Sequence, residues 1–208
     1  MVTYQVLTEK EIQEDLFRDF QRRQEVTRRL EKTAEGWTVR EDRFVEDWGP
    51  EEYQILVRCL RHTAASGGLV LGAFSERKLK GFVSVEGAPA GSRGQYLELS
   101  SLHVSRELRG QGIGAALFEA ARRFAWERGI RRLYISAHPT AETQAFYRAM
   151  GCREAEEYQH SQTEHTLPLS AGVRNGAAPP LTSPEKSGTI GNAAGRATAC
   201  SRLPELHS

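Results

Sequence analysis

The feature that most constrains this chain is a glycine-rich segment, Arg109-Gly-Gln-Gly-Ile-Gly114, which lies between a strand-like run and a helix-like run. Its three alternate glycines let the backbone pass close to a ligand. They also direct consecutive N–H groups, and the positive end of the helix that follows, toward an anion. Phosphate or pyrophosphate suits such a loop best. The junction therefore predicts a fold in which an anion binds where a strand leads into the start of a helix.

Two familiar phosphate-binding patterns fit this loop less well. The phosphate loop of nucleotide hydrolases has the form GxxxxGK[ST], and no Lys-Ser or Lys-Thr follows these glycines. The dinucleotide-binding pattern is matched nominally by Gly110, Gly112 and Ala115. In that fold, however, the strand runs straight into the first glycine, whereas residues 105–109 intervene here. The strand-like run at 133–136 also lacks the acidic residue that would bind a ribose.

Periodicity around the loop predicts an α/β or α+β domain, a mixed sheet flanked by helices. The strand-like runs are residues 69–74, 79–85, 96–104 and 133–136, and the helix-like runs are residues 9–30, 50–66, 113–128 and a run from 140. We expect the first two strands to form an antiparallel hairpin and the last two to pair in parallel. The helix over 9–30 rests on the spacing of four apolar residues, Ile12, Leu16, Phe20 and Val26. Residues 37–50 are the least predictable part.

Composition changes near residue 169. Of the 39 residues from 170 to 208, 21 are Ala, Gly, Pro or Ser and none is aromatic, so burial cannot offset the entropy lost on ordering them. We expect a folded domain over 1–160, with a recognisable core at 69–151, and a low-complexity, disordered tail over 161–208. A shifted reading frame near residue 159 is a further hypothesis, because one choice of codons for residues 167–173, read one base along, gives a strand-like sequence. In that case the sheet lacks its last strand.

Charge and hydropathy exclude several classes of protein. With 28 Lys plus Arg against 27 Asp plus Glu, the chain has no overall field that would attract nucleic acid or an anionic membrane. Its apolar stretches fall short of the ~20 residues that a membrane span needs. We expect no secretion signal, because residues 1–10 turn acidic before an apolar core could form. Three cysteines without a CxxC pair or clustered histidines indicate no metal site. We expect a cytoplasmic protein, a monomer or a homodimer, with no metal.

The loop and a second motif together resemble the GNAT superfamily of acetyl-coenzyme A-dependent N-acetyltransferases. Residues 109–114 fit its [RQ]xxGx[GA] loop, and residues 140–151 are similar to its late Asn-x-x-Ala-x-x-Phe-Tyr-x-x-x-Gly-Phe helix. The resemblance covers residues 69–151 and implies the GNAT acyltransferase fold. It also implies transfer of an acetyl group from acetyl-coenzyme A to an amine acceptor, by direct attack in a ternary complex. A non-catalytic acyl-coenzyme A-binding module is the alternative.

The resemblance assigns contacts with acetyl-coenzyme A to the loop, the preceding strand and the late helix. The pyrophosphate would be held by backbone amides of Arg109, Gly110, Gln111, Gly112, Ile113 and Gly114. The pantetheine arm would pair with the strand backbone at Leu102 and Val104, beside His103. Thr140 stands where the family commonly has an Asn that touches the cofactor, and Thr143 where it often has Ala, so the chain departs from the family pattern here.

Glu98 is the leading candidate for a general base. Only the free amine attacks a thioester, and a primary ammonium has a pKa of about 10, so a carboxylate that accepts its proton assists the reaction. Glu98 lies eleven residues before Arg109, the spacing at which some members of the superfamily carry this base. Period two places it on the face of Ser100 and Leu102. His103 is a second candidate by its ordinary pKa.

Tyr147 matches the tyrosine that protonates the departing thiolate in many members of the superfamily. For each of these candidates a structural role is the alternative: Glu98 as a polar strand residue, His103 as a structural histidine and Tyr147 as a core aromatic. The acceptor cleft is expected from residues 10–65, which include acidic residues near tryptophans: Trp37, Glu46, Asp47, Trp48, Glu51 and Glu52. Such a cleft suits a cationic amine. A small amine, a polyamine, an aminoglycoside and a protein amine all remain candidates.

Overall fold

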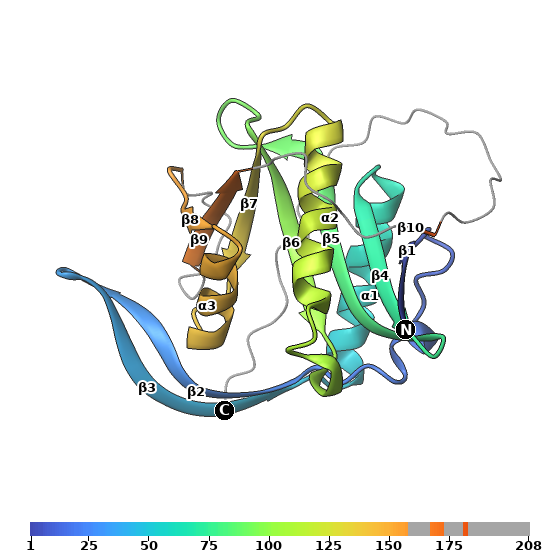
Figure 1. Ribbon diagram of the computed structural model, residues 1–208, viewed down its shortest axis with the longest axis horizontal. Helices are drawn as coiled ribbons and strands as arrows, with labels where there is room; N and C mark the ends of the chain where they lie inside the picture. The colour runs from blue at the N-terminus through green and yellow to red at the C-terminus, as the bar shows by residue number, and fades with distance from the viewer. Residues whose placement is uncertain (158–166, 173–180, 183–208) are drawn as a thin grey trace.

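The structure is a computed structural model that describes residues 1–157, 167–172 and 181–182 (Figure 1). The strands are β1 (Val2–Val6), β2 (Arg23–Thr33), β3 (Gly36–Asp47), β4 (Leu69–Ser75), β5 (Lys78–Ala90), β6 (Tyr96–Val104), β7 (Arg132–Ala137), β8 (Arg153–Glu154), β9 (Leu167–Gly172) and β10 (Leu181–Thr182). The α-helices are α1 (Pro50–Ala65), α2 (Ile113–Glu127) and α3 (Ala141–Ala149), and two 3-10 helices are η1 (Glu14–Phe17) and η2 (Arg106–Leu108). No helix in these described ranges has the length and apolar character of a membrane span.

Eight strands form one mixed sheet in the order β10-β1-β4-β5-β6-β7-β9-β8. β4 and β5 form the predicted antiparallel hairpin. β6 and β7, which are joined by the crossover helix α2, pair in parallel as predicted. α2 and α3 cover one face of the sheet and α1 covers the other (Figure 1). The sequence prediction of a mixed sheet flanked by helices is confirmed.

The two largest apolar cores of the described residues lie on the two faces of the sheet, and a smaller cluster consists of Tyr96, Tyr134 and Ala155. The larger core joins the sheet to α2 and includes Leu71, Leu97 and Leu117, which are fully buried. The other core lies under α1 and η1 and includes Leu56 and Phe82. α1 begins at Pro50, and the Glu52 carboxylate accepts a hydrogen bond from the Gly49 amide (Glu52 Oε2 to Gly49 N, 2.8 Å), which caps the helix as the Pro-Glu-Glu sequence predicts.

The predicted helix over residues 9–30 is wrong. This segment contains η1, a loop and the strand β2, which pairs with β3 in a separate two-stranded sheet. Ile12, Phe20 and Val26 are buried as expected, but Ile12 and Phe20 lie in loops on either side of η1 and Val26 lies in β2. Residues 37–47, which the sequence left undefined, lie in β3. Figure 1 shows the β2–β3 hairpin as a long curved arm that crosses the end of β6 and runs beneath α3.

The expectation that the sheet lacks its last strand is also wrong. β9 pairs antiparallel with β7 from Arg132↔Gly172 to Ala137↔Leu167, and β8 pairs with β9. Leu169 and Ala171 are buried in the larger core. These two apolar residues alternate as the buried face of a strand requires, but the average composition of the segment gave no indication of a strand. Apart from β9 and β10, the tail predicted over 161–208 lies outside the described residues.

Candidate functional site

The glycine loop has the backbone that its sequence predicts. Gly110 and Gly112 both lie in the left-handed region, with φ of +76° and +81°. A Cβ atom built on either residue would meet nothing within 4 Å, so no side chain of the described residues fills the space beside them. Residues other than glycine are strained in this conformation. These two positions therefore require glycine, and they leave the loop open on its outer side.

α2 begins at this loop without a capping side chain. Gly112 is the N-cap residue, and no side chain of the residues that the structure describes caps the first-turn amides. Amides in the first turn of a helix have no partner within the helix, and with the helix dipole they form a site for an anion. Ile113 is buried, so only its backbone faces the loop. A Cβ at Gly114 would lie 3.3 Å from Phe146 Cε2, so Gly114 serves the close packing of α2 on α3.

A gap between β6 and β7 lies beside this loop. The parallel pairing ends at Leu99↔Ile135, whereas β6 continues to Val104 and β7 to Ala137. Past Ser101, β6 keeps its pairing with β5. Strand backbone groups alternate between the two edges of a strand. Because the Ser105 amide donates to Lys80 O on the β5 side, the backbone of Val104 and of Leu102 faces the gap.

The cofactor residues predicted from the sequence thus come together at one end of the sheet. The open glycine loop and the uncapped amides of α2 fit a diphosphate, and the unpaired edge of β6 fits an extended chain that carries amides. The Val104 carbonyl, however, already accepts a hydrogen bond from Arg109 Nε at 3.0 Å. Arg109 therefore supports the end of β6 through its side chain, and the Leu102 backbone is the more accessible part of the edge.

A β-bulge at Ser100 changes which side chains share a face of β6. Ser84 pairs with Ser101 and Val85 with Leu99, so Ser100 is the extra residue of β6, and its hydroxyl lies within hydrogen-bond distance of the Ser84 hydroxyl (2.8 Å). Leu97 and Leu99 contact the α2 core before the bulge, and Leu102 and Val104 contact the same core after it. The prediction that Glu98 shares a face with Leu102 is therefore wrong, because strict period two does not hold across the bulge.

Glu98 instead lies on the α1 face. Its neighbour there is Glu86 of β5, whose carboxylate accepts a hydrogen bond from Thr63 of α1 (Oγ1 to Oε1, 2.9 Å). Burial raises the pKa of Glu98, and the negative charge of Glu86 raises it further. A carboxylate in this state binds a proton more readily than an exposed one. Glu98 thus has the environment of a proton acceptor, although its catalytic role stays a prediction.

Tyr147 belongs to the opposite face of the sheet. It lies on α3, is 6% exposed, and packs against Phe118 and Phe146 at ring-centroid distances of 6.0 and 5.1 Å. Burial raises the pKa of its hydroxyl. Cys152 lies nearby, and burial raises the pKa of its thiol to about 12. Tyr147 is therefore a core aromatic by its packing, and its role as an acid also stays a prediction.

Thr140 is used within the protein. It is the N-cap residue of α3, and its hydroxyl oxygen accepts hydrogen bonds from the Thr143 amide at 3.4 Å and from Gln24 Nε2 at 3.3 Å. The hydroxyl donates to Thr143 Oγ1 at 2.8 Å. Thr140 and Thr143, which both depart from the family pattern, thus form one capping arrangement. A contact between Thr140 and a cofactor remains a prediction.

His103 leads to residues that sequence reasoning missed. It is partly buried between Trp48 and Phe82, and its Nδ1 accepts a hydrogen bond from Arg22 Nε at 3.2 Å. Desolvation lowers the pKa of His103 well below its usual value, and the charges of Arg22 and Arg109 lower it further. His103 is therefore neutral and serves as an acceptor for Arg22. No spacing in the sequence distinguishes Arg22 from the other arginines near it.

Comparisons with known proteins agree with this geometry. A family model described as the acetyltransferase (GNAT) family matches residues 18–152. No curated protein matches the sequence. Among solved structures, nourseothricin acetyltransferase is similar with a TM-score of 0.61 and 20% identity, over 83% of this chain and 99% of that one.

Two further solved structures contain the coenzyme. One is described as a streptothricin acetyltransferase from Bacillus anthracis str. Ames in complex with acetyl coenzyme A (TM-score 0.63, 13% identity, 83% of this chain and 98% of that one). The other is PaiA N-acetyltransferase from Thermoplasma acidophilum in complex with coenzyme A (TM-score 0.53, 13% identity, 83% of this chain and 99% of that one). At these identities the likeness shows the fold alone.

Proposed function

Because the chain belongs to the acetyltransferase (GNAT) family, we propose that it transfers the acetyl group of acetyl-coenzyme A to the nitrogen of an amine. The observation that carries the proposal is the open loop at Gly110 and Gly112, which leads to the uncapped start of α2 beside an unpaired edge of β6. A diphosphate joined to an amide-bearing arm matches both parts of this site. The loop and the strand edge thus support acetyl-coenzyme A as the acetyl donor.

Backbone groups would make most of the contacts with acetyl-coenzyme A. The amides from Gly110 to Gly114 would hold the pyrophosphate, and Leu102 would pair with the pantetheine arm. When bound, acetyl-coenzyme A supplies an acetyl group activated as a thioester. Because backbone groups make these contacts, we expect side-chain substitutions at exposed Gln111 to affect binding little.

Glu98 would act as the base. An amine arrives mainly as its ammonium form at neutral pH and must lose a proton before its lone pair can attack. Glu98 would take that proton, directly or through one water molecule, and the pKa raised by burial and by Glu86 favours this step. The nitrogen then bonds to the acetyl carbon as the carbon–sulfur bond breaks.

Tyr147 would give a proton to the departing thiolate. Its raised pKa keeps the hydroxyl protonated, which is the state that a donor needs. Direct transfer in a ternary complex is favoured over an acyl-enzyme at Cys152, because a thiol with a pKa of about 12 is almost entirely protonated at neutral pH. Glu98 and Tyr147 lie on opposite faces of the sheet. This arrangement suits a base that deprotonates the amine on one side of the thioester and an acid that protonates the thiolate on the other side.

Binding and turnover can be tested separately. Acetyl-coenzyme A and coenzyme A should each raise the melting temperature of the protein. Release of free thiol should then depend on an amine, and mass spectrometry should find an acetylated amine in a panel of polyamines, aminoglycosides, streptothricin and peptides. Stabilisation without thiol release from any amine would favour a non-catalytic acyl-coenzyme A-binding module. Absence of stabilisation by either form of the coenzyme would contradict the proposal.

A further inference from the structure

Arg22 is a buried arginine with one nitrogen left unused. Its side chain is 9% exposed, and it immediately precedes β2. Nε donates to His103 Nδ1 at 3.2 Å, and Nη2 donates to Glu46 Oε2 at 2.9 Å. Nη1 is buried and has no hydrogen-bond partner among the described residues. A buried N–H of a charged group without a partner is costly, and such groups are normally satisfied in proteins.

The guanidinium is held in place from several sides. It lies over the ring of Trp48, 5.2 Å from the ring centroid. The Arg22 amide donates to Tyr53 Oη at 3.3 Å, and the Arg22 carbonyl accepts from the Trp48 amide at 3.2 Å. Two of its three nitrogens and its backbone are therefore fixed. An arginine fixed in this way presents its remaining N–H groups in one direction, which favours recognition of a planar, oxygen-bearing group.

Arg22 lies at the open end of the gap between β6 and β7. His103 is near the end of β6, and His138 directly follows β7. Glu46 joins the two sides, because its Oε2 accepts from Arg22 while its Oε1 lies 3.1 Å from His138 Nε2. The β2–β3 hairpin thus places a chain of charged and polar groups across the gap. His103 contacts Phe82 of the α1 core, so this chain lies on the face that also carries Glu98.

The local charge favours an anion at Nη1. Desolvation is the largest cause of the lowered pKa of His103, the charges of Arg22 and Arg109 lower it further, and Glu46 opposes them with a smaller effect. Glu46 is already shared between Arg22 Nη2 and His138, so it does not pair with Nη1. A second anion at Nη1 would therefore meet an excess of positive charge.

We propose that Arg22 Nη1 binds a carboxylate of the acceptor, so that the substrate is an amine that also carries a carboxylate. The inference rests on the proposed function and adds the substrate class. Glu98 lies on the same face of β6, five residues before His103. An acceptor that reaches from Glu98 to Arg22 would therefore meet charges of opposite sign at its ammonium and at its carboxylate. Amino acids with a side-chain amine, and peptides with a free carboxyl end, belong to this class.

Matched amines test the proposal. Lysine and cadaverine differ only in the carboxylate, and so do ornithine and putrescine. We expect the wild-type protein to show kcat/KM values about 10- to 100-fold higher for the carboxylated member of at least one pair, the range of a hydrogen bond between charged groups. In Arg22→Gln this ratio should fall to about one. Titration of each amine into the complex with coenzyme A, followed by tryptophan fluorescence, should give the same ratio of Kd values without turnover.

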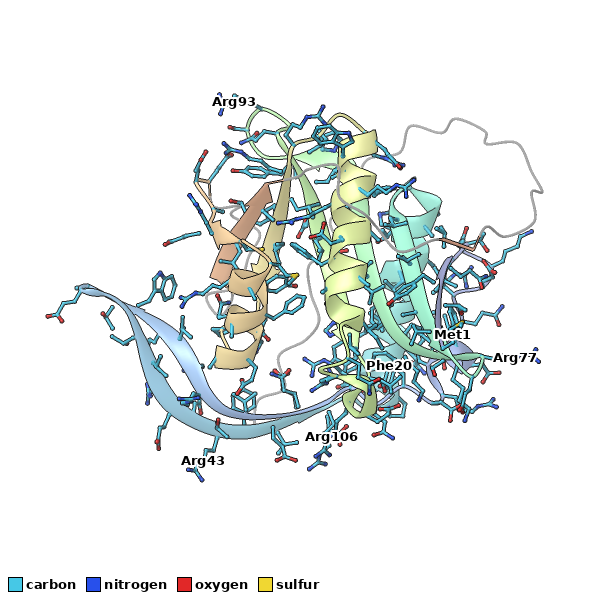
Figure 2. All side chains as sticks on the ribbon, in the orientation of Figure 1. Met1, Phe20, Arg43, Arg77, Arg93 and Arg106 are labelled. Carbon is cyan, nitrogen blue, oxygen red and sulfur yellow. The ribbon has the colours of Figure 1, made fainter. Side chains whose placement is uncertain are left out.

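A second arginine provides the control. Arg106 lies at the same end of β6, is exposed, and pairs with Glu25 at 3.3 Å; Figure 2 shows it below α2, at the base of the hairpin. Arg106→Gln removes the same charge and should leave the ratio unchanged. Arg22→Lys keeps the charge but loses the planar fork, so we expect it to lower the ratio about fivefold. If circular dichroism shows that Arg22→Gln does not fold, Arg22→Lys replaces it as the test variant.

Several results would overturn the proposal. One is equal or better use of the decarboxylated amines by the wild-type protein. Another is a ratio that persists in both Arg22 variants. If no amine of either pair is acetylated, the fluorescence titration decides, and carboxylated amines that bind no more tightly contradict the proposal. Failure of the proposed function gives a different result, because acetyl-coenzyme A would then neither bind nor release its thiol with any amine.

Discussion

Gly112 offers a direct test of the cofactor loop, because the same helix supplies a matched control. Gly112 precedes α2 with φ of +81°, and Gly129 follows it with φ of +77°. A Cβ at either position meets nothing within 4 Å. Substitution by alanine therefore creates no clash at either end and imposes the same backbone strain. The two variants differ in one respect only, which is that Gly112 lies in the loop assigned to the pyrophosphate.

The magnitude of each effect follows from this geometry. A left-handed conformation costs a residue with a Cβ about 1–2 kcal/mol. For a chain of this size each kcal/mol lowers the melting temperature by about 2–4 °C, so both variants should melt about 2–8 °C below the wild type. Gly112→Ala also places a methyl group where the ligand would lie. Loss of one hydrogen bond to a charged group, about 1.5–3 kcal/mol, corresponds to roughly 10- to 100-fold weaker binding.

Isothermal titration calorimetry with acetyl-coenzyme A, alongside thermal melting, separates the two effects. Gly112→Ala should raise the Kd by about 10- to 100-fold. Gly129→Ala should change the Kd by less than about twofold while losing similar stability. Equal Kd values for both variants would refute the assignment of this loop, because strain alone would then account for everything observed.

Three further predictions concern titratable groups. Glu98→Gln should lower kcat by about 10²- to 10⁴-fold in steady-state assays. Because burial and Glu86 raise the pKa of Glu98, kcat/KM of the wild type should fall with decreasing pH already above pH 4.5. Glu86→Gln should move this acidic limb of the pH profile to lower pH. Tyr147→Phe should lower kcat by about tenfold, at the low end for an acid because a thiolate leaves readily, and a kcat equal to wild type would leave Tyr147 purely structural. Burial raises the pKa of Glu46, but the hydrogen bonds and charges of His138 and Arg22 outweigh it and lower the pKa to about 2. Stability from Glu46 is therefore fully present above about pH 4.5 and lost toward pH 2, so Glu46→Gln should show a shallower fall in melting temperature over that range than the wild type.

Local signals in the sequence were sufficient for the central part of the fold. Gly67, Gly129 and Gly151 have positive φ, and each follows the end of a helix, as the sequence pattern predicts. The apolar face of α2 follows the 3.6-residue period, and the short strand after it pairs in parallel with β6. In this part of the chain each element is bounded by residues whose own conformational preferences define its ends.

The N-terminal part could not be read in the same way. Ile12, Leu16, Phe20 and Val26 are spaced four, four and six residues apart, which imitates one face of a helix. They reach the core from a loop, a 3-10 helix and a strand. The half-buried positions of β3 include charged residues, because exposure alternates there between half-buried Asp42, Phe44 and Glu46 and exposed Arg43, Val45 and Asp47. Figure 2 shows Arg43 pointing away from α3. Hydrophobicity therefore does not alternate with the period of two that predicts a strand, although exposure does.

The part of the site that consists of backbone groups was predictable from the sequence. The part in which side chains from distant segments meet was not. Gly110 and Gly112 follow from sequence because only glycine accepts their conformation. The face of Glu98 did not follow, because the bulge at Ser100 depends on how β5 pairs with β6. Arg22 meets His103 across 81 positions of sequence. Such contacts have no local signature.

The bulge at Ser100 also determines how this strand tolerates insertions and deletions. Side chains before it and after it are in opposite phase, and the larger core requires both phases at once. Loss of Ser100 would remove the extra residue and leave Leu99 and Leu102 two positions apart, so a regular strand would keep both on the α2 face. Insertion of one more residue beside Ser100, with the bulge retained, would instead turn His103 toward α2 and Leu102 toward the charged groups of the hairpin. This strand therefore tolerates loss of a residue at the bulge better than gain of one.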